Sequence, residues 1–260
     1  MAARAMWKGR VRIASTAVAV KLYSAAVDKR VHFRLLHAKD KAPVQQSMVD
    51  PETGESVSHE AAKRGYRLED GSYVVLEAEE LAAIQPKESR DIEVLRFVPK
   101  GSVDPQWFVR PYYLGPDGSA QEHAALLRAL AEEEMDAVVR WTMRKKAYVG
   151  LLRAEEGAMT LVTLRRTEEI IAVDEVRPAQ TSEPNPRERS MAEQLVEMFQ
   201  GEFDPKEYRD EYRERVLAFV QAKARGRKPT VRKIAPRKPE KDLMSALAAS
   251  LKRGAPRKVA

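Results

Sequence analysis

Hydrophobic and polar residues alternate along the first part of the chain, which is typical of β-strands with one buried face. In residues 7–13 the odd positions are apolar or glycine, and in residues 18–22 the even positions are Val or Leu, while Lys21 faces away from that apolar side. A third alternating run covers Val31–Asp40. The cationic positions opposite the apolar faces of the first two runs are Lys8, Arg10, Arg12 and Lys21. The pattern predicts three strands with one core face and one strongly positive face.

Further strand and helix patterns follow after a long polar stretch, residues 39–67. The predicted strands are Tyr73–Leu76, Ile92–Val98, Trp107–Leu114, Ala137–Met143, Ala147–Arg153 and Met159–Arg165. Helical patterns cover Glu77–Ile84, which Pro86 ends, and Glu122–Glu134. So many strands joined by short turns favour an antiparallel barrel or sandwich. We predict an α+β fold with an antiparallel β-barrel core and an insertion that begins at about residue 39.

The end of the strand-rich region is marked by Pro-rich and polar residues at Thr181–Pro186. Asn185-Pro186 and Asp204-Pro205 each predict the start of a helix, because Asn and Asp cap helices and proline suits the first turn. The apolar stripes of the two helices include Leu195, Phe199, Tyr208 and Tyr212. We expect these stripes to be buried, either against the barrel of the same chain or against another subunit.

The last part of the chain is rich in Lys, Arg and Pro, and we expect residues 227–260 to form a flexible basic tail. A short segment within it, Asp242–Lys252, has a helical apolar stripe. The residues of that stripe are Leu243, Met244, Leu247 and Leu251. A helix of this length is marginally stable alone, so we expect it to fold in the groove of a partner or to dock back onto its own chain.

Charge is distributed unevenly along the 260 residues. The whole chain has a net charge of +7, yet residues 222–260 contain 13 Lys and Arg against 2 Asp and Glu. The preceding residues therefore carry 33 basic and 37 acidic side chains. A basic tail on a mildly acidic body points to a polyanionic partner, although it could also serve only to keep the protein soluble. Cysteine is absent, and no apolar run is long enough to span a membrane. We expect a cytoplasmic, nucleoid-associated protein.

Motifs for catalysis and metal binding are missing from the sequence. The residues His32, His37, His59 and His123 are the only histidines, and none has the spacing of a metal-ligand motif. The sequence contains no phosphate-binding glycine loop and no Gly-x-Ser-x-Gly nucleophile motif. The run Glu132-Glu133-Glu134 is more typical of a solvated helix face than of an acid–base pair. We therefore expect no enzymatic activity, metal or cofactor.

Cationic residues at strand spacing form the most informative pattern. Arg140, Thr142 and Arg144 alternate with Val139, Trp141 and Met143, and Lys145 and Lys146 extend the positive face. Such residues can contact successive phosphates without reading bases. Since no recognition helix, zinc finger or stacking platform is evident, the pattern favours sequence-independent binding of duplex nucleic acid.

Four sequence blocks, in this order and spacing, resemble the bacterial Ku family. They are Met6–Gly9 (MWKG), Val18–Ala25 (VAVKLYSA), Val31–Asp40 (VHFRLLHAKD) and Ser89–Pro99 (SRDIEVLRFVP). The resemblance covers residues 4–226, with a further match at 242–252. It implies a homodimeric ring that threads onto double-stranded DNA ends and recruits an ATP-dependent end-joining DNA ligase for double-strand break repair.

The resemblance also implies an organisation and a set of sites. Residues 1–180 would form the barrel with a DNA bridge at about residues 39–90. Residues 185–226 would form a helical arm that supports the dimer through Leu195, Phe199, Tyr208 and Tyr212, and the tail stripe would bind the ligase. Together with the charge pattern, it gives as DNA-binding candidates Lys8, Arg10, Lys39, Lys41, Lys63, Arg64, Arg140, Arg144 and Lys145.

Two other functions are compatible with the sequence. A general nucleoid-type binder would depend on the basic tail alone. A metal-free hydrolase or nuclease would use the acidic body, but no group of residues in the sequence supports that chemistry.

Overall fold

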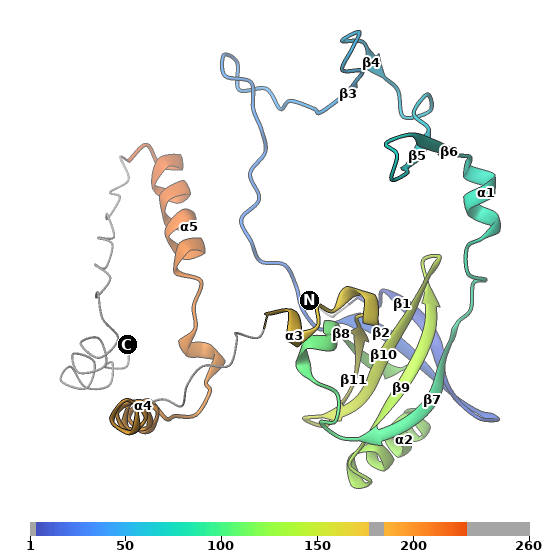
Figure 1. Cartoon of the computed structure of the whole chain (residues 1–260), viewed down its shortest axis with the longest axis vertical. Coiled ribbons are helices and arrows are strands. Elements are labelled where there is room, and N and C mark those ends of the chain that lie inside the picture. The colour runs from blue at the N-terminus through green and yellow to red at the C-terminus, as the bar shows by residue number, and fades with distance from the viewer. Residues whose placement is uncertain (1–3, 177–184, 228–260) are drawn as a thin grey trace. The chain divides into compact units, whose positions relative to one another are not determined.

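A computed structural model describes residues 4–176 and 185–227, and seven of its strands form a closed β-barrel (Figure 1). The strands are β1 (Trp7–Ile13), β2 (Thr16–Ser24), β7 (Asp91–Pro99), β8 (Phe108–Pro116), β9 (Met135–Met143), β10 (Lys146–Glu155) and β11 (Ala158–Leu164). Their order around the barrel is β1-β2-β8-β11-β10-β9-β7. All neighbours are antiparallel except β1 and β7, which pair in parallel and close the barrel. The predicted barrel is confirmed.

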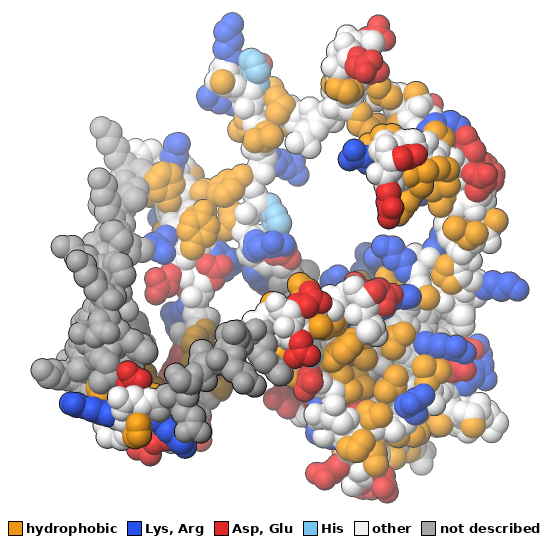
Figure 2. Space-filling view, viewed as in Figure 1, with side chains coloured by type: hydrophobic (Ala, Val, Ile, Leu, Met, Phe, Trp, Pro, Cys, Tyr) orange, Lys and Arg blue, Asp and Glu red, His pale blue; other side chains and the backbone are white. Residues whose placement is uncertain are grey.

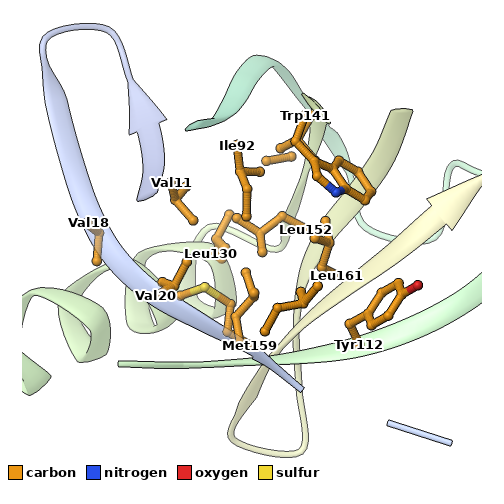
Figure 3. Close-up of a cluster of buried hydrophobic side chains, with 14 of the residues drawn as sticks. Val11, Val18, Val20, Ile92, Tyr112, Leu130, Trp141, Leu152, Met159 and Leu161 are labelled. Carbon is orange, nitrogen blue, oxygen red and sulfur yellow. The ribbon is translucent and has the colours of Figure 1, made fainter. Parts of the chain in front are cut away.

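The interior of the barrel is filled by the apolar members of the alternating patterns. Side chains from strands on all sides point toward one another, as Figure 3 shows for Val11, Val20 and Leu161. All three are fully buried. Full burial of an aliphatic side chain stabilises a fold by about 1.5–3 kcal/mol, so this cluster is the main source of stability. The outward positions of the same strands remain free for charged residues.

Helix α2 (Ala120–Glu132) closes one end of the barrel. It begins at Ser119, whose hydroxyl accepts a hydrogen bond from the amide of Glu122. The helix contacts strands on opposite sides of the barrel, namely β2 and β8 as well as β9 and β10. Leu130 is buried in the interior cluster, and Leu126 and Leu127 pack against it. We call the end that α2 covers the helix end.

Residues 25–90, which we call the excursion, connect β2 to β7 (Figure 1). Short elements within it are the hairpins β3 (Met48–Val49) with β4 (Ser56–Val57) and β5 (Arg64–Arg67) with β6 (Tyr73–Leu76), followed by helix α1 (Ala78–Ala83). The strand Tyr73–Leu76 and the helix after it are thereby confirmed.

The strand predicted for Val31–Asp40 is wrong. Only a single bridge, between Leu36 and Pro43, forms there, and Leu35 is 67% exposed. The physical reason lies in the barrel, where β1 and β8 occupy both edges of β2. A run of alternating residues needs a free strand edge to pair with. Without one it forms no interstrand hydrogen bonds and its apolar side chains are not buried.

Strand register places both connections of the excursion at the end of the barrel opposite α2. The excursion leaves at Ser24, the end of β2, which runs antiparallel to β8 and pairs there with Tyr112 in the middle of β8. It returns at Asp91, the first residue of β7, which pairs with Arg10. The β9–β10 turn lies at this same end, because Trp141 near the end of β9 pairs with Ile92 near the beginning of β7. We call this the excursion end.

A second unit is made of residues 173–176 and 185–227, together with residues 29–33 from the excursion. It contains α3 (Val173–Val176), α4 (Pro186–Met198) and α5 (Glu211–Ala224). The side chain of Asn185 caps α4, as predicted. Asp204 starts only a 3₁₀ turn, η3 (Pro205–Glu207), and α5 begins later, after the cap Asp210. Two further 3₁₀ turns, η1 (Pro105–Trp107) and η2 (Thr167–Glu169), belong to the barrel unit. No helix among the described residues has the length and apolar character needed to cross a membrane.

Candidate nucleic-acid interface

The β9–β10 turn places two cations at the excursion end of the barrel. Met143 pairs with Lys146, so Arg144 and Lys145 are the two central residues of the hairpin turn. Both have positive φ angles, 51° for Arg144 and 62° for Lys145. Such turns suit the twist of a hairpin but normally contain Asn and Gly, because other side chains are strained in this conformation. A strained turn made of two exposed cations is a candidate binding feature.

The outer side of β1 and β2 carries a lysine pair around one carboxylate. Lys8 and Lys21 stand directly opposite each other on the two strands. Asp117, just after β8, lies between them, 2.8 Å from the Lys21 ammonium and 3.2 Å from that of Lys8. The hydrogen bond from Lys21, with a smaller contribution from Lys8, lowers the pKa of Asp117 below its ordinary value. The same bond raises the pKa of Lys21.

An arginine pair surrounds a second carboxylate beside the seam between β1 and β7. Nε of Arg10 donates to Oδ1 of Asp91 at 3.1 Å, and Nη2 of Arg10 forms an ion pair with the same oxygen at 3.0 Å. Nε of Arg12 donates to Oδ2 at 3.0 Å, and its Nη2 forms an ion pair with that oxygen at 2.9 Å. All three side chains are at least partly exposed, so the cluster is accessible from solvent.

Arg140 forms a third ion pair on the outer wall. Its Nε donates to the carboxylate of Glu93 at 2.7 Å, across the pairing of β9 with β7. This hydrogen bond, reinforced by the opposite charge, raises the pKa of the guanidinium. Figure 2 shows the resulting surface, on which Lys and Arg side chains lie next to Asp and Glu side chains on the barrel. The positive face predicted from the sequence is therefore a face of mixed charge with an excess of cations.

The candidates in the excursion lie apart from those on the barrel strands. Lys39 and Lys41 belong to an exposed turn, in which the amide of Ala42 donates to Asp40 and lowers the pKa of that carboxyl. The ammonium of Lys41 donates to the carbonyl of Ala38 at 2.6 Å.

The remaining excursion candidates belong to the β5–β6 hairpin and its approach. Arg64 begins β5 and is exposed, and the preceding Lys63 is paired with Glu77 at 2.6 Å. The hairpin is a two-stranded ribbon whose turn lines a shallow open hollow together with Tyr66. A ribbon of this kind is narrow enough to approach a groove of duplex DNA.

The four predicted arm residues lie in the second unit. Leu195, on α4, is partly buried, whereas Phe199 follows α4 and is 53% exposed. Tyr208 stacks on Phe203 with ring centroids 5.3 Å apart, and Tyr212 lies in the first turn of α5, largely exposed. The predicted ligase-binding residues Leu243, Met244, Leu247 and Leu251 lie outside the described residues.

Sequence reasoning missed the acidic members of these clusters. Asp91 lies within one of the blocks that carry the family resemblance, and Asp117 lies within a turn sequence, so neither stood out as a binding residue. The alternation also could not reveal that Arg12 and Lys21 belong to the same ion-pair clusters as Arg10 and Lys8. Within the described ranges no group of His, Asp and Glu has the geometry of a metal site.

Comparison with known proteins gives a consistent result. The family model described as "Ku70/Ku80 beta-barrel domain" matches residues 12–192, more than half of the chain. The chain is similar to Non-homologous end joining protein Ku 2 of Geotalea uraniireducens, with 34% identity over 97% of this chain and 99% of the relative. It is also similar to the Non-homologous end joining protein Ku of Heliobacterium modesticaldum, with 34% identity over 96% of this chain and 92% of that protein. The Mycobacterium tuberculosis protein of the same name is 33% identical over 96% of this chain and 95% of its own.

Proposed function

This chain belongs to the Ku family, and from that premise we propose that it binds the ends of double-stranded DNA and acts in non-homologous end joining. The observation that carries the proposal is the coincidence of two features at one end of the barrel. Both connections of the excursion are there, and so is the cationic turn formed by Arg144 and Lys145. A loop that starts and finishes beside a cationic surface is a suitable means of holding a polyanion.

Binding would depend on phosphates and would not depend on sequence. The helix that belongs to the barrel, α2, packs against its strands, whereas exposed cations are spread over strands and hairpins. Phosphate contacts of this kind fix position without reading bases. The proposed contacts are Lys8, Arg10, Lys39, Lys41, Lys63, Arg64, Arg140, Arg144 and Lys145.

Preference for ends would follow from topology. Two subunits that join through the apolar residues of α4 and α5 would close a ring, and a closed ring can load only where a duplex terminates. Exposed aromatic residues such as Phe199 and Tyr212 support this role, because large apolar side chains on a surface mark protein contacts. The tail stripe around Leu247 would recruit the DNA ligase. The barrel and its cations suffice for binding in this proposal, with no ATP, metal or catalytic step.

The experiment compares one duplex in two forms, as a linear fragment and as a covalently closed circle, in a mobility-shift assay at physiological salt. The proposal expects binding to the linear form only, and protein loaded on linear DNA should be retained when both ends are then blocked. Equal binding to circles would refute the end-binding ring. A sedimentation measurement of the free chain tests the dimer separately.

A second candidate function rests on the charge distribution. Because residues 222–260 carry the cationic excess while the rest of the chain is mildly acidic, the tail alone could attach the protein to nucleic acid. Removing residues 227–260 separates the two functions. A tail-driven binder loses nearly all affinity for duplex DNA, whereas a ring that holds DNA through the barrel keeps its affinity for linear fragments.

A further inference from the structure

We propose that Asp91 and Asp117 are built-in phosphate mimics, carboxylates that occupy two phosphate sites on the outer wall of the barrel until DNA displaces them. The inference rests on the proposed DNA binding and adds a mechanism to it. Each carboxylate is held between two cations that the sequence pattern directs outward, and each cation remains accessible. A backbone phosphate presents the same chemistry, two anionic oxygens that accept from two donors.

The geometry around Asp91 is that of a phosphate receptor. Each of its two oxygens accepts a charge-assisted hydrogen bond from the Nε of one arginine and lies within ion-pair distance of the Nη2 of the same guanidinium. Such charge-assisted bonds form to phosphate oxygens as well as to carboxylates. Arg10 and Arg12 come from alternate positions of a single strand, so β1 fixes their separation. The receptor is therefore formed by the barrel itself, and a phosphate oxygen can replace a carboxylate oxygen without rearranging the strands.

Neighbouring residues leave room for an incoming phosphate. On the side away from Asp91, Arg10 and Arg12 stand opposite Ala19 and Ala17 of β2, whose side chains are too short to cover a guanidinium. The side chains of Arg10 and Arg12 are 53% and 38% exposed. A phosphate can therefore reach the open side of either arginine.

Asp117 repeats the arrangement with lysines. Lys8 and Lys21 share it from adjacent strands, and the Lys8 side chain is 57% exposed. Lysine is a point charge with rotatable donors, so its ammonium can turn from the carboxylate to a phosphate without moving its backbone. Since exposed ion pairs are weak, either cluster can exchange its anion at little cost.

The consequence is that Asp91 and Asp117 lower the affinity of this surface for DNA, because they compete with the phosphates for the same cations. When a phosphate leaves, a carboxylate a few ångströms away takes its place, so the cations are never left without an anion. This favours DNA that shifts along the surface over DNA that is held in one position.

The test uses the full-length chain with Asp91→Asn, Asp117→Asn and the double substitution, and measures the dissociation constant for a short linear duplex over a range of salt. Each substitution keeps the shape of the side chain and removes its charge. We expect about threefold tighter binding for each single variant and about tenfold for the double variant, since one exposed ion pair is worth a few-fold in an equilibrium. The salt slope should steepen by up to about 0.9 per site.

Glu132→Gln is the matched control, because it removes one negative charge at the last residue of α2, outside both ion-pair clusters. It should leave affinity within a small factor of wild type. An equal gain in DNA affinity for Glu132→Gln would show that the effect comes only from the change in net charge, and it would overturn the inference. Unchanged or weaker DNA binding by both Asp91→Asn and Asp117→Asn would also overturn the inference. The two carboxylates would then only stabilise the barrel or orient the neighbouring cations.

Two further outcomes keep the inference separate from the proposed function and from folding. A wild-type chain that does not bind linear duplex refutes the proposed function itself. Asp91 lies at the seam between β1 and β7, so thermal unfolding is measured for each variant. Asp117 lies away from that seam, and Asp117→Asn alone therefore decides the inference if Asp91→Asn fails to fold.

Discussion

Replacing Arg144 by Asn and Lys145 by Gly separates the contribution of the β9–β10 turn to stability from its contribution to binding. Both residues have left-handed backbone angles, a conformation that costs an ordinary residue about 1–2 kcal/mol. Asn and Gly adopt it readily, and Asn-Gly is the preferred sequence for this turn. We therefore expect the double variant to be more stable by about 2 kcal/mol, which corresponds to about 6 °C in the melting temperature.

The same variant should bind DNA less well. It removes two cations at the excursion end of the barrel, and each lost phosphate contact lowers the salt slope by about 0.9. The expected change is thus about 1.8 per subunit, measured as the slope of the logarithm of the binding constant against the logarithm of salt concentration. Loss of affinity should be uniform across duplex sequences, because phosphate contacts do not read bases.

The barrel supplies its own control at the helix end. The β10–β11 turn has the same conformation, with positive φ angles at Glu156 and Gly157, but already contains glycine at its second position. Glu156→Asn should raise stability by about 1 kcal/mol without weakening DNA binding. The reasoning about strain is wrong if the Arg144 and Lys145 double variant melts at a lower temperature. An unchanged salt slope would show that the turn does not contact phosphates.

Three further predictions concern the core, the outer wall and the tail. Gly150→Ala should destabilise the barrel by about 3 kcal/mol in chemical unfolding, because its added carbon would lie 2.6 Å from a ring carbon of Trp141; a wild-type midpoint would contradict this packing. The lowered pKa of Asp117 means that its charge stabilises the fold above the unfolded-state value of about 3.8, and that this stability is lost as the pH falls through the lower folded-state value. Unfolding measured against pH should show less acid sensitivity in Asp117→Asn, and an identical pH profile would refute the linkage. Leu247→Asp should abolish stimulation of the proposed partner, an end-joining DNA ligase, while leaving duplex affinity nearly unchanged, and normal stimulation would exclude the tail stripe as the contact.

The barrel strands could be predicted from the sequence because burial on one face imposes a period of two. Val11 and Val20 show the rule, since both are fully buried and their outward neighbours are exposed or half-buried. The run around Leu35 has the same period but forms no strand, because alternation indicates a capacity to pair and does not supply a partner. Strand order decided the outcome, and strand order depends on contacts between segments far apart in the sequence.

The ion-pair clusters were beyond prediction for a related reason. Asp91 is distant in the sequence from Arg10, and only the parallel pairing of β7 with β1 brings them together. Asp117, which follows β8, reaches Lys8 on β1 only because both strands pair with β2. A sequence pattern can show that a residue faces outward, but it cannot show which charge faces it across a neighbouring strand.

The parallel pairing that closes the barrel has a consequence for how the family can vary. β1 and β7 are joined through Arg10, Val11 and Arg12, and this short seam fixes where the excursion must return, whatever its length. Closing a flexible loop becomes only about 0.6 kcal/mol harder for each doubling of its length. Evolution can therefore lengthen or shorten residues 25–90 with little effect on folding stability. If the excursion encloses DNA as proposed, the space that it leaves for DNA and the stability of the barrel can be selected independently.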